Sequence, residues 1–122
     1  MKLHLHATAG ANTIHAHGEG YVVVNSLRIE HPVIVMPDRL IDPWPVSATQ
    51  QLALNDFTPL IELKPELVIF GSGPVFRFPD PRIMAAFSAA KMGFEVMNTP
   101  AACRTYNILM AEGRNVAAAL LI

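Results

Sequence analysis

The chain has 122 residues, a formal net charge of −1 at pH 7, 52% hydrophobic and 16% charged residues, and one cysteine. This length fits a single domain, residues 1–122, and the apolar fraction is too high for a disordered chain. Nine Lys and Arg against ten Asp and Glu leave no basic excess for phosphates, so we expect no nucleic-acid partner. The single cysteine excludes an internal disulfide framework and a multi-cysteine zinc site.

The chain shows no pattern typical of a membrane span or a secretory signal. Its longest apolar run, residues 116–122, is far shorter than the roughly 20 residues that a spanning helix needs. Polar and apolar residues already alternate over residues 2–6, where a signal peptide would have a continuous apolar core. We therefore expect a cytoplasmic protein without a membrane span.

The first third of the chain is typical of antiparallel strands joined by tight turns. Polar and apolar residues alternate over residues 2–6 and 13–17, which is the period of half-buried strands. The glycines on either side of Glu19, and Asn25 with Ser26, favour turns because Gly and Asn tolerate positive φ angles. Further strands are expected at residues 21–24, 27–30 and 33–36.

The middle of the chain has the least regular pattern. Three prolines within residues 36–45 predict an extended loop. Ser47 is suited to cap one or two helical turns over residues 47–54. Between Pro43 and Pro65 the chain passes from a β-rich front half to a back half in which strands and helices alternate.

The back half predicts a strand, helix, strand, helix, strand order. Residues 67–70 are a continuous apolar run, which is typical of a strand buried on both faces. The first helix is expected to begin with Asp80 as its N-cap and Pro81 at its first position, and to end at Gly93. The remaining strands are expected at residues 94–97 and 116–122.

The second helix is expected to have Thr99 as its N-cap and Pro100 at its first position, and to end at Gly113. Connections this short between successive strands predict parallel pairing through right-handed crossovers. Together the patterns predict an α/β domain in which a central mixed sheet is flanked by helices in three layers. Its N-terminal half is antiparallel and β-rich, and its C-terminal half is a βαβαβ unit.

One candidate site lies where the parallel strands end, because open α/β sheets bind ligands outside the carboxyl ends of their strands. Two loops are expected to face each other there. One contains Gly71, Ser72 and Gly73, and the other opens the second helix at Thr99. Free amides at the start of a helix attract anions. We call this predicted site the strand-end crevice.

Three polar residues of the second helix belong to the same candidate site: Cys103, Arg104 and Asn107. A cation near a helix N-terminus opposes the helix dipole, so Arg104 is expected to have a specific partner, either a bound anion or Glu95. A charge such as Glu95 inside an apolar strand needs a partner of its own. Cys103 is either a thiolate favoured by the helix dipole and Arg104 or a small buried hydrophobe.

A second candidate site is aromatic. Trp44, held between two prolines, is either a lid over the edge of the core or a contact for a partner. Phe76 and Phe78 are two positions apart with Arg77 between them, so on an extended segment both rings lie on one face. If both rings are exposed, they would form an apolar surface patch suited to binding another protein.

No cofactor or metal is expected. The histidine pairs His4 with His6 and His15 with His17 could hold zinc or copper, but exposed strand positions commonly carry histidines without a role. No carboxylate or cysteine follows them at ligand spacing.

The most specific sequence pattern lies in the back half. Residues 93–109 read GFEVMNTPAACRTYNIL, residues 112–120 read EGRNVAAAL, and residues 65–73 read PELVIFGSG. These segments resemble the family of the mitochondrial complex I assembly factor 3 and the adipogenesis-associated domain protein. Ser72 stands where this family is expected to have threonine more often. The resemblance covers nearly the whole chain and is strongest in the back half.

The resemblance implies a small α/β domain with a central mixed sheet, and no established enzymatic activity. Two hypotheses follow. The first is a non-enzymatic protein-binding or assembly-factor-like module whose partner surface includes Trp44, Phe76 and Phe78. The alternative is a site for an anionic small molecule, or an enzyme site, in the strand-end crevice, using Ser72, Thr99, Cys103 and Arg104.

Overall fold

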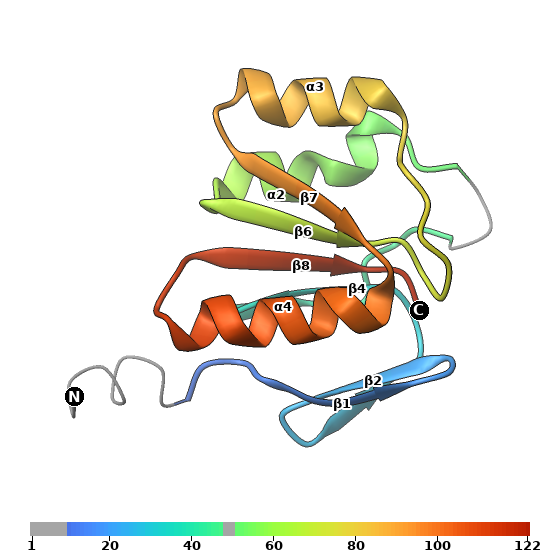
Figure 1. Ribbon diagram of the computed structural model, residues 1–122, viewed down its shortest axis with the longest axis vertical. Coiled ribbons are helices and arrows are strands. Elements are labelled where there is room, and N and C mark those ends of the chain that lie inside the picture. The colour runs from blue at the N-terminus through green and yellow to red at the C-terminus, as the bar shows by residue number, and fades with distance from the viewer. Residues whose placement is uncertain (1–9, 48–50) are drawn as a thin grey trace.

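The computed structural model describes residues 10–47 and 51–122. Its elements, in chain order (Figure 1), are β1 (Ile14–Gly18), β2 (Tyr21–Val24), β3 (Leu27–Ile29), β4 (Val33–Met36), β5 (Arg39–Ile41), the 3-10 helix η1 (Leu54–Phe57), α2 (Thr58–Leu63), β6 (Leu67–Gly71), α3 (Pro81–Ala89), β7 (Gly93–Met97), α4 (Thr99–Ala111) and β8 (Val116–Leu120). The strand expected at residues 2–6 lies outside the described residues.

The strands form two sheets. β1, β2 and β3 make a three-stranded antiparallel sheet, and the other strands make a five-stranded sheet in the order β5-β4-β8-β6-β7. In the larger sheet β6 pairs in parallel with β7 and with β8, whereas β4 is antiparallel to β8 and to β5. The predicted α/β class, with an antiparallel front half and a βαβαβ back half around a mixed sheet, is confirmed.

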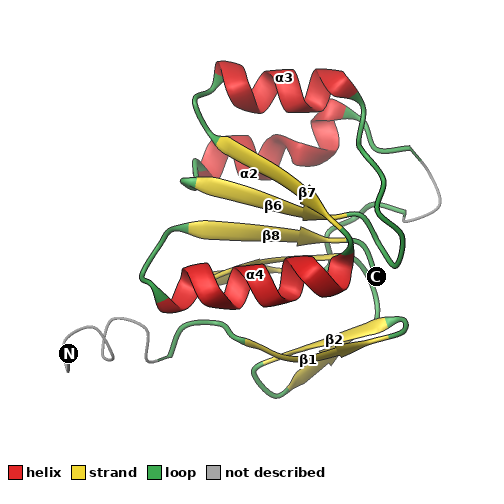
Figure 2. Cartoon of the chain, in the orientation of Figure 1, coloured by secondary structure: helices red, strands yellow, loops and turns green. Residues whose placement is uncertain are grey.

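Helices cover both faces of the five-stranded sheet (Figure 2). Successive residues of β8 point to opposite faces, as the pleat of a strand requires. Ala118 and Leu120 pack in the cluster that contains α4 and the three-stranded sheet. Ala117 and Ala119 pack in the other cluster, with η1, α2 and α3. The core is therefore two apolar layers separated by the sheet.

The segment between β4 and β6 is more regular than predicted. Residues 39–41, expected within an extended loop, form β5, in which Leu40 stands opposite Val35 of β4. The helical turns expected at residues 47–54 were placed too early in the sequence, because η1 begins at Leu54 and α2 carries Pro59 in its first turn. Residues 48–50 lie outside the described residues. A three-residue strand is too short for alternation to reveal it.

The first helix of the back half, α3, begins where the sequence predicts and ends earlier than predicted. The carboxylate of Asp80 accepts a hydrogen bond from the Arg82 N–H at 2.9 Å, which makes Asp80 the N-cap. The helix ends at Ala89 and not at Gly93. Lys91 adopts a left-handed φ of 60°, so the chain has already reversed when Gly93 begins β7.

Candidate functional site

The two loops predicted to face each other meet at the carboxyl ends of the parallel strands. The Gly73 N–H donates to the Thr99 hydroxyl oxygen at 2.9 Å, and the Thr99 N–H donates to the Gly73 carbonyl at 2.8 Å. The Thr99 hydroxyl in turn donates to the Leu121 carbonyl at 2.6 Å. A Cβ added at Gly71 would lie 3.0 Å from that hydroxyl oxygen. The close approach of the strand ends thus depends on the Thr99 hydroxyl and on the absence of a side chain at Gly71.

The start of α4 has no free amide for an anion, so this part of the prediction is wrong. Asn98, and not Thr99, is the N-cap, and its side-chain oxygen accepts from the Ala101 N–H at 2.9 Å. The Ala102 N–H donates to the Asn98 carbonyl, and the Thr99 N–H is bonded to the facing loop. Pro100 has no N–H. Each donor that would attract an anion is used within the fold or absent.

Ser72 organises the loop that follows β6. Its buried hydroxyl donates to the Val75 carbonyl at 2.8 Å and accepts from the Arg77 N–H at 3.0 Å. The Ser72 N–H itself donates to the Met97 carbonyl of β7 at 2.8 Å. The serine of the predicted anion site is therefore occupied in shaping residues 73–77.

Cys103 and Arg104 lie on different sides of α4. Cys103 is 1% exposed, and its burial raises the pKa of the thiol to about 12, against the smaller opposing effect of the Arg104 charge. The thiolate hypothesis is thus not supported. Arg104 and Glu95 are both exposed, and within residues 10–47 and 51–122 no ion pair joins them.

Asn107 has a structural partner at the far end of the chain. Its side-chain oxygen accepts from the Ile14 N–H at 2.9 Å, and its side-chain nitrogen donates to the Ile14 carbonyl at 2.7 Å. The preceding residue of the helix, Tyr106, donates its hydroxyl to the Asn12 carbonyl at 2.7 Å. Asn107 and Tyr106 therefore attach the β1 segment to α4.

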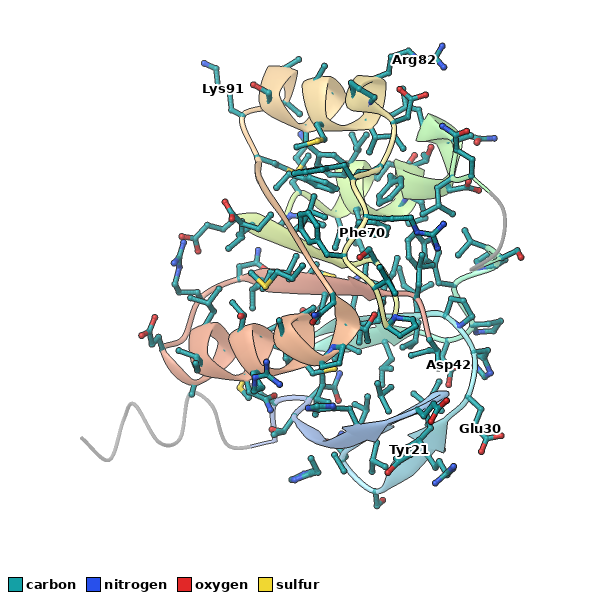
Figure 3. The ribbon with its side chains drawn as sticks, turned by 45° about the vertical axis from the view of Figure 1, so that its right-hand side comes forward. Tyr21, Glu30, Asp42, Phe70, Arg82 and Lys91 are labelled. Atoms are coloured by element: carbon teal, nitrogen blue, oxygen red, sulfur yellow. The ribbon has the colours of Figure 1, made fainter. Side chains whose placement is uncertain are left out.

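Trp44 belongs to the core, so its assignment to a partner surface is wrong. It is 1% exposed, and its indole N–H donates to the Asp56 carbonyl at 2.9 Å. Its ring meets the Phe57 ring edge to face, with 5.3 Å between centroids. Trp44 closes one edge of the layer beneath α3, where Phe70 also lies near the centre of the molecule (Figure 3).

Phe76 and Phe78 do lie on the surface, and together. They are 48% and 67% exposed, their ring centroids are 4.8 Å apart in an edge-to-face arrangement, and the neighbouring Val75 is 64% exposed. Arg77 is exposed between them and has no ion pair among the described residues. We call residues 74–78 the aromatic loop.

A cavity lies beside the facing loops, and part of its wall comes from residues that the sequence patterns did not place at this end of the sheet. It has a volume of about 400 Å³. The end of the β1–β2 hairpin forms one wall of it, and that hairpin is remote in sequence from the ends of the parallel strands. The residues that line the cavity are His17, Gly18, Glu19, Gly20, Tyr21, Pro74, Thr99, Pro100, Leu121 and Ile122.

Within the described part of the chain, no three or more His, Cys, Asp and Glu side chains are grouped so that they could hold a metal ion. His4 and His6 lie outside that part. Among its helices, none is both long enough and apolar enough to cross a membrane.

The fold and the strand-end geometry define a small two-sheet α/β domain. Residues 14–121 match the family described as "Protein of unknown function (DUF498/DUF598)", and the chain belongs to this family. It is 37% identical to a protein of Bordetella parapertussis of known crystal structure, with a TM-score of 0.84 over 92% of this chain and 96% of that one. A Bordetella pertussis structure described as an Mth938-like domain has a TM-score of 0.76 at 30% identity, over 90% and 85% of the two chains.

Among curated proteins, the chain is similar to the Bos taurus protein named NADH dehydrogenase (ubiquinone) 1 alpha subcomplex assembly factor 3. The identity is 33% over 101 residues, which are 81% of this chain and 54% of the bovine protein. The chain thus spans about half the length of this relative. The predicted resemblance to the complex I assembly factor 3 family is confirmed.

Proposed function

We propose that this domain is a non-enzymatic, protein-binding module of the assembly-factor type, and that the aromatic loop is its docking surface. The observation that carries the proposal is the exposure of Val75, Phe76 and Phe78 within four consecutive residues. Exposed apolar groups that cluster on a surface are typical of interaction sites. Aromatic and arginine side chains, here with Arg77 between the two rings, carry much of the binding energy of protein interfaces.

The aromatic loop is held in one conformation by contacts within the chain. Ser72 bonds the backbone of Val75 and of Arg77, and Gly73 is bonded in both directions to Thr99. A loop that is ordered before binding loses less conformational entropy in a complex. Ser72 and Thr99 therefore support binding by shaping the loop, without contacting a partner themselves.

The similarity to relatives named as assembly factors supports a protein as the partner. The burial of Cys103, whose thiol pKa is raised to about 12, favours a non-enzymatic role for this helix, because a nucleophilic cysteine acts as the thiolate.

The test is quantitative affinity purification of the tagged full chain from its native cells, with Phe76→Ser/Phe78→Ser compared with the unchanged protein. Leu27→Ser/Ile108→Ser is the matched control, since these side chains are 51% and 61% exposed on other elements. We expect a stoichiometric protein partner that the Phe variant loses and the control retains. Retention of the partner by a folded Phe76→Ser/Phe78→Ser variant, or the absence of a protein partner, would contradict the proposal.

A further inference from the structure

The cavity of about 400 Å³ beside the facing loops is a second feature at the same end of the sheet. Its volume lies within the range of roughly 300–1,000 Å³ that small-molecule sites occupy. We propose that this cavity binds a small, uncharged and mostly apolar molecule. The proposal is separate from the docking surface, because the exposed apolar side chains Val75, Phe76 and Phe78 do not line the cavity, although Pro74 at the start of the aromatic loop does.

The position of the cavity follows from the strand order. β6 lies between β7 and β8, so the chain leaves β6 toward one side of the sheet and then crosses back to the other. Open α/β sheets bind ligands at such a switch point, outside the carboxyl ends of the strands. Pro74, Pro100 and Leu121 follow the three parallel strands and line the cavity together.

The wall facing the switch point comes from the end of the β1–β2 hairpin, which contributes His17 through Tyr21. Tyr21 and Glu30 lie with the three-stranded sheet, at the end of the molecule opposite Arg82 and Lys91 (Figure 3). The cavity is thus a pocket between the two sheets and the start of α4.

The chemistry of the walls indicates the class of ligand. Most of the lining is apolar, from prolines, Leu121 and Ile122. The Thr99 hydroxyl is already bonded on both sides, to Gly73 and to Leu121. Glu19 is the charged carboxylate in the lining, and it disfavours an anion by like-charge repulsion. An uncharged, apolar molecule fits this set of groups, whereas an anion does not.

His17 is the polar group that can orient the ligand. It is half-buried and lines the cavity, and no hydrogen bond or ion pair within residues 10–47 and 51–122 engages its ring. An imidazole both donates and accepts hydrogen bonds in its neutral form. We therefore infer a ligand with an apolar body and one hydrogen-bonding group directed at His17.

Contacts within the chain hold the walls in position. The Tyr21 ring packs over Gly18 so closely that a Cβ there would lie 2.5 Å from a ring carbon. On the same ring, the Arg28 guanidinium carbon lies 3.9 Å from the centroid. The Leu121 N–H donates to the Gly71 carbonyl at 2.9 Å. Because these contacts fix the shape, a ligand would meet a preformed pocket.

The test uses indole, a neutral aromatic molecule with one N–H, in an NMR titration of the full chain labelled with ¹⁵N. We expect saturable shifts of the backbone amides of Gly18, Gly20 and Ile122. Ile122→Trp replaces an aliphatic side chain of the pocket wall, beyond the end of β8, with a bulky aromatic one, and should weaken binding by about tenfold or more. Ile108→Trp makes the same exchange on an exposed face of α4 and should leave binding unchanged.

His17→Phe is a second variant, which keeps an apolar ring and removes the hydrogen-bonding nitrogens. We expect it to fold and to bind indole more weakly than the unchanged chain. If Ile122→Trp does not fold, His17→Phe provides the test of the proposed site. Non-saturable shifts, shifts confined to Phe76 and Phe78, or equal affinity in a folded Ile122→Trp variant would overturn the proposal.

Discussion

The side chain of Asn107 forms hydrogen bonds with both backbone polar groups of Ile14, although the two residues are 93 positions apart. At this point the carboxamide takes the place of a neighbouring strand, because a peptide group and an amide side chain offer the same donor and acceptor. The contact attaches β1, an edge strand of the three-stranded sheet, to α4. Since the β1–β2 hairpin lines the cavity, the same contact positions one wall of the proposed pocket.

Replacing Asn107 should therefore loosen β1. We expect Asn107→Ala to lower the free energy of unfolding by about 1–3 kcal/mol, since two hydrogen bonds are lost and the Ile14 backbone is left unpaired. Denaturant unfolding and hydrogen exchange of the Ile14 amide are the measurements. Arg104→Ala, at an exposed position of the same helix, is the control and should change stability little. An unchanged exchange rate at Ile14 would contradict the assignment.

Trp44 is expected to contribute to the stability of the fold. Trp44→Ala should lower the free energy of unfolding by about 3–5 kcal/mol, because it opens a cavity in the core and leaves the Asp56 carbonyl without its donor. Thermal or urea unfolding measures the loss. Phe78→Ala is the matched comparison on an exposed aromatic residue and should stay within about 0.5 kcal/mol. Comparable effects of the two substitutions would refute this distinction.

Cys103 should be unreactive in the folded protein. Burial raises the pKa of its thiol to about 12, and the thiol form is a poor nucleophile. We expect slow modification by a thiol reagent at pH 8 and fast modification after unfolding in denaturant. Mass spectrometry of the modified chain makes the measurement. Fast modification under native conditions would restore the thiolate hypothesis.

The same burial predicts loss of stability at alkaline pH. The unfolded chain gives up the Cys103 proton near the usual pKa of 9.0, whereas the folded chain keeps it until about pH 12. Stability therefore falls between these values, by up to about 1.4 kcal/mol per pH unit for one group. Burial also raises the pKa of Tyr106, which acts in the same direction. We expect Cys103→Ala to show a shallower decline than the unchanged chain when unfolding is measured from pH 8 to 12.

Ser72 should control the order of the aromatic loop. We expect Ser72→Ala to leave the domain folded and to speed hydrogen exchange at the Arg77 amide, because this N–H loses its acceptor. Binding of the partner proposed for Phe76 and Phe78 should weaken at the same time, since the loop would have to be ordered on binding. Ser72→Thr keeps the hydroxyl and is the control. Slow exchange at Arg77 in Ser72→Ala would count against this role.

Most of the fold could be predicted because its signals are local. The apolar run of β6 and the cap formed by Asp80 depend on neighbouring residues alone, and both are found where expected. The short strand β5 was missed because its regularity comes from pairing with β4. α2 was not predicted because its six residues are too few for a helical period to stand out.

The candidate sites were harder to predict than the fold. The pattern correctly brought Gly73 and Thr99 together, since both follow parallel strands. It could not show that Asn98 would supply the cap. Nor could it show that Trp44 would turn inward, because two flanking prolines fit a buried and an exposed ring equally.

The amino-acid sequence by itself determined the class of fold, the family and the order of most strands and helices, because periodicity, caps and turn residues act over a few positions. Only the tertiary structure decided which polar side chains were free to act. Ser72, Thr99 and Asn107 could each have met a ligand, and each instead satisfies backbone groups of its own chain. The cavity has the same origin, since its walls come from segments remote in sequence that meet only after both sheets have packed.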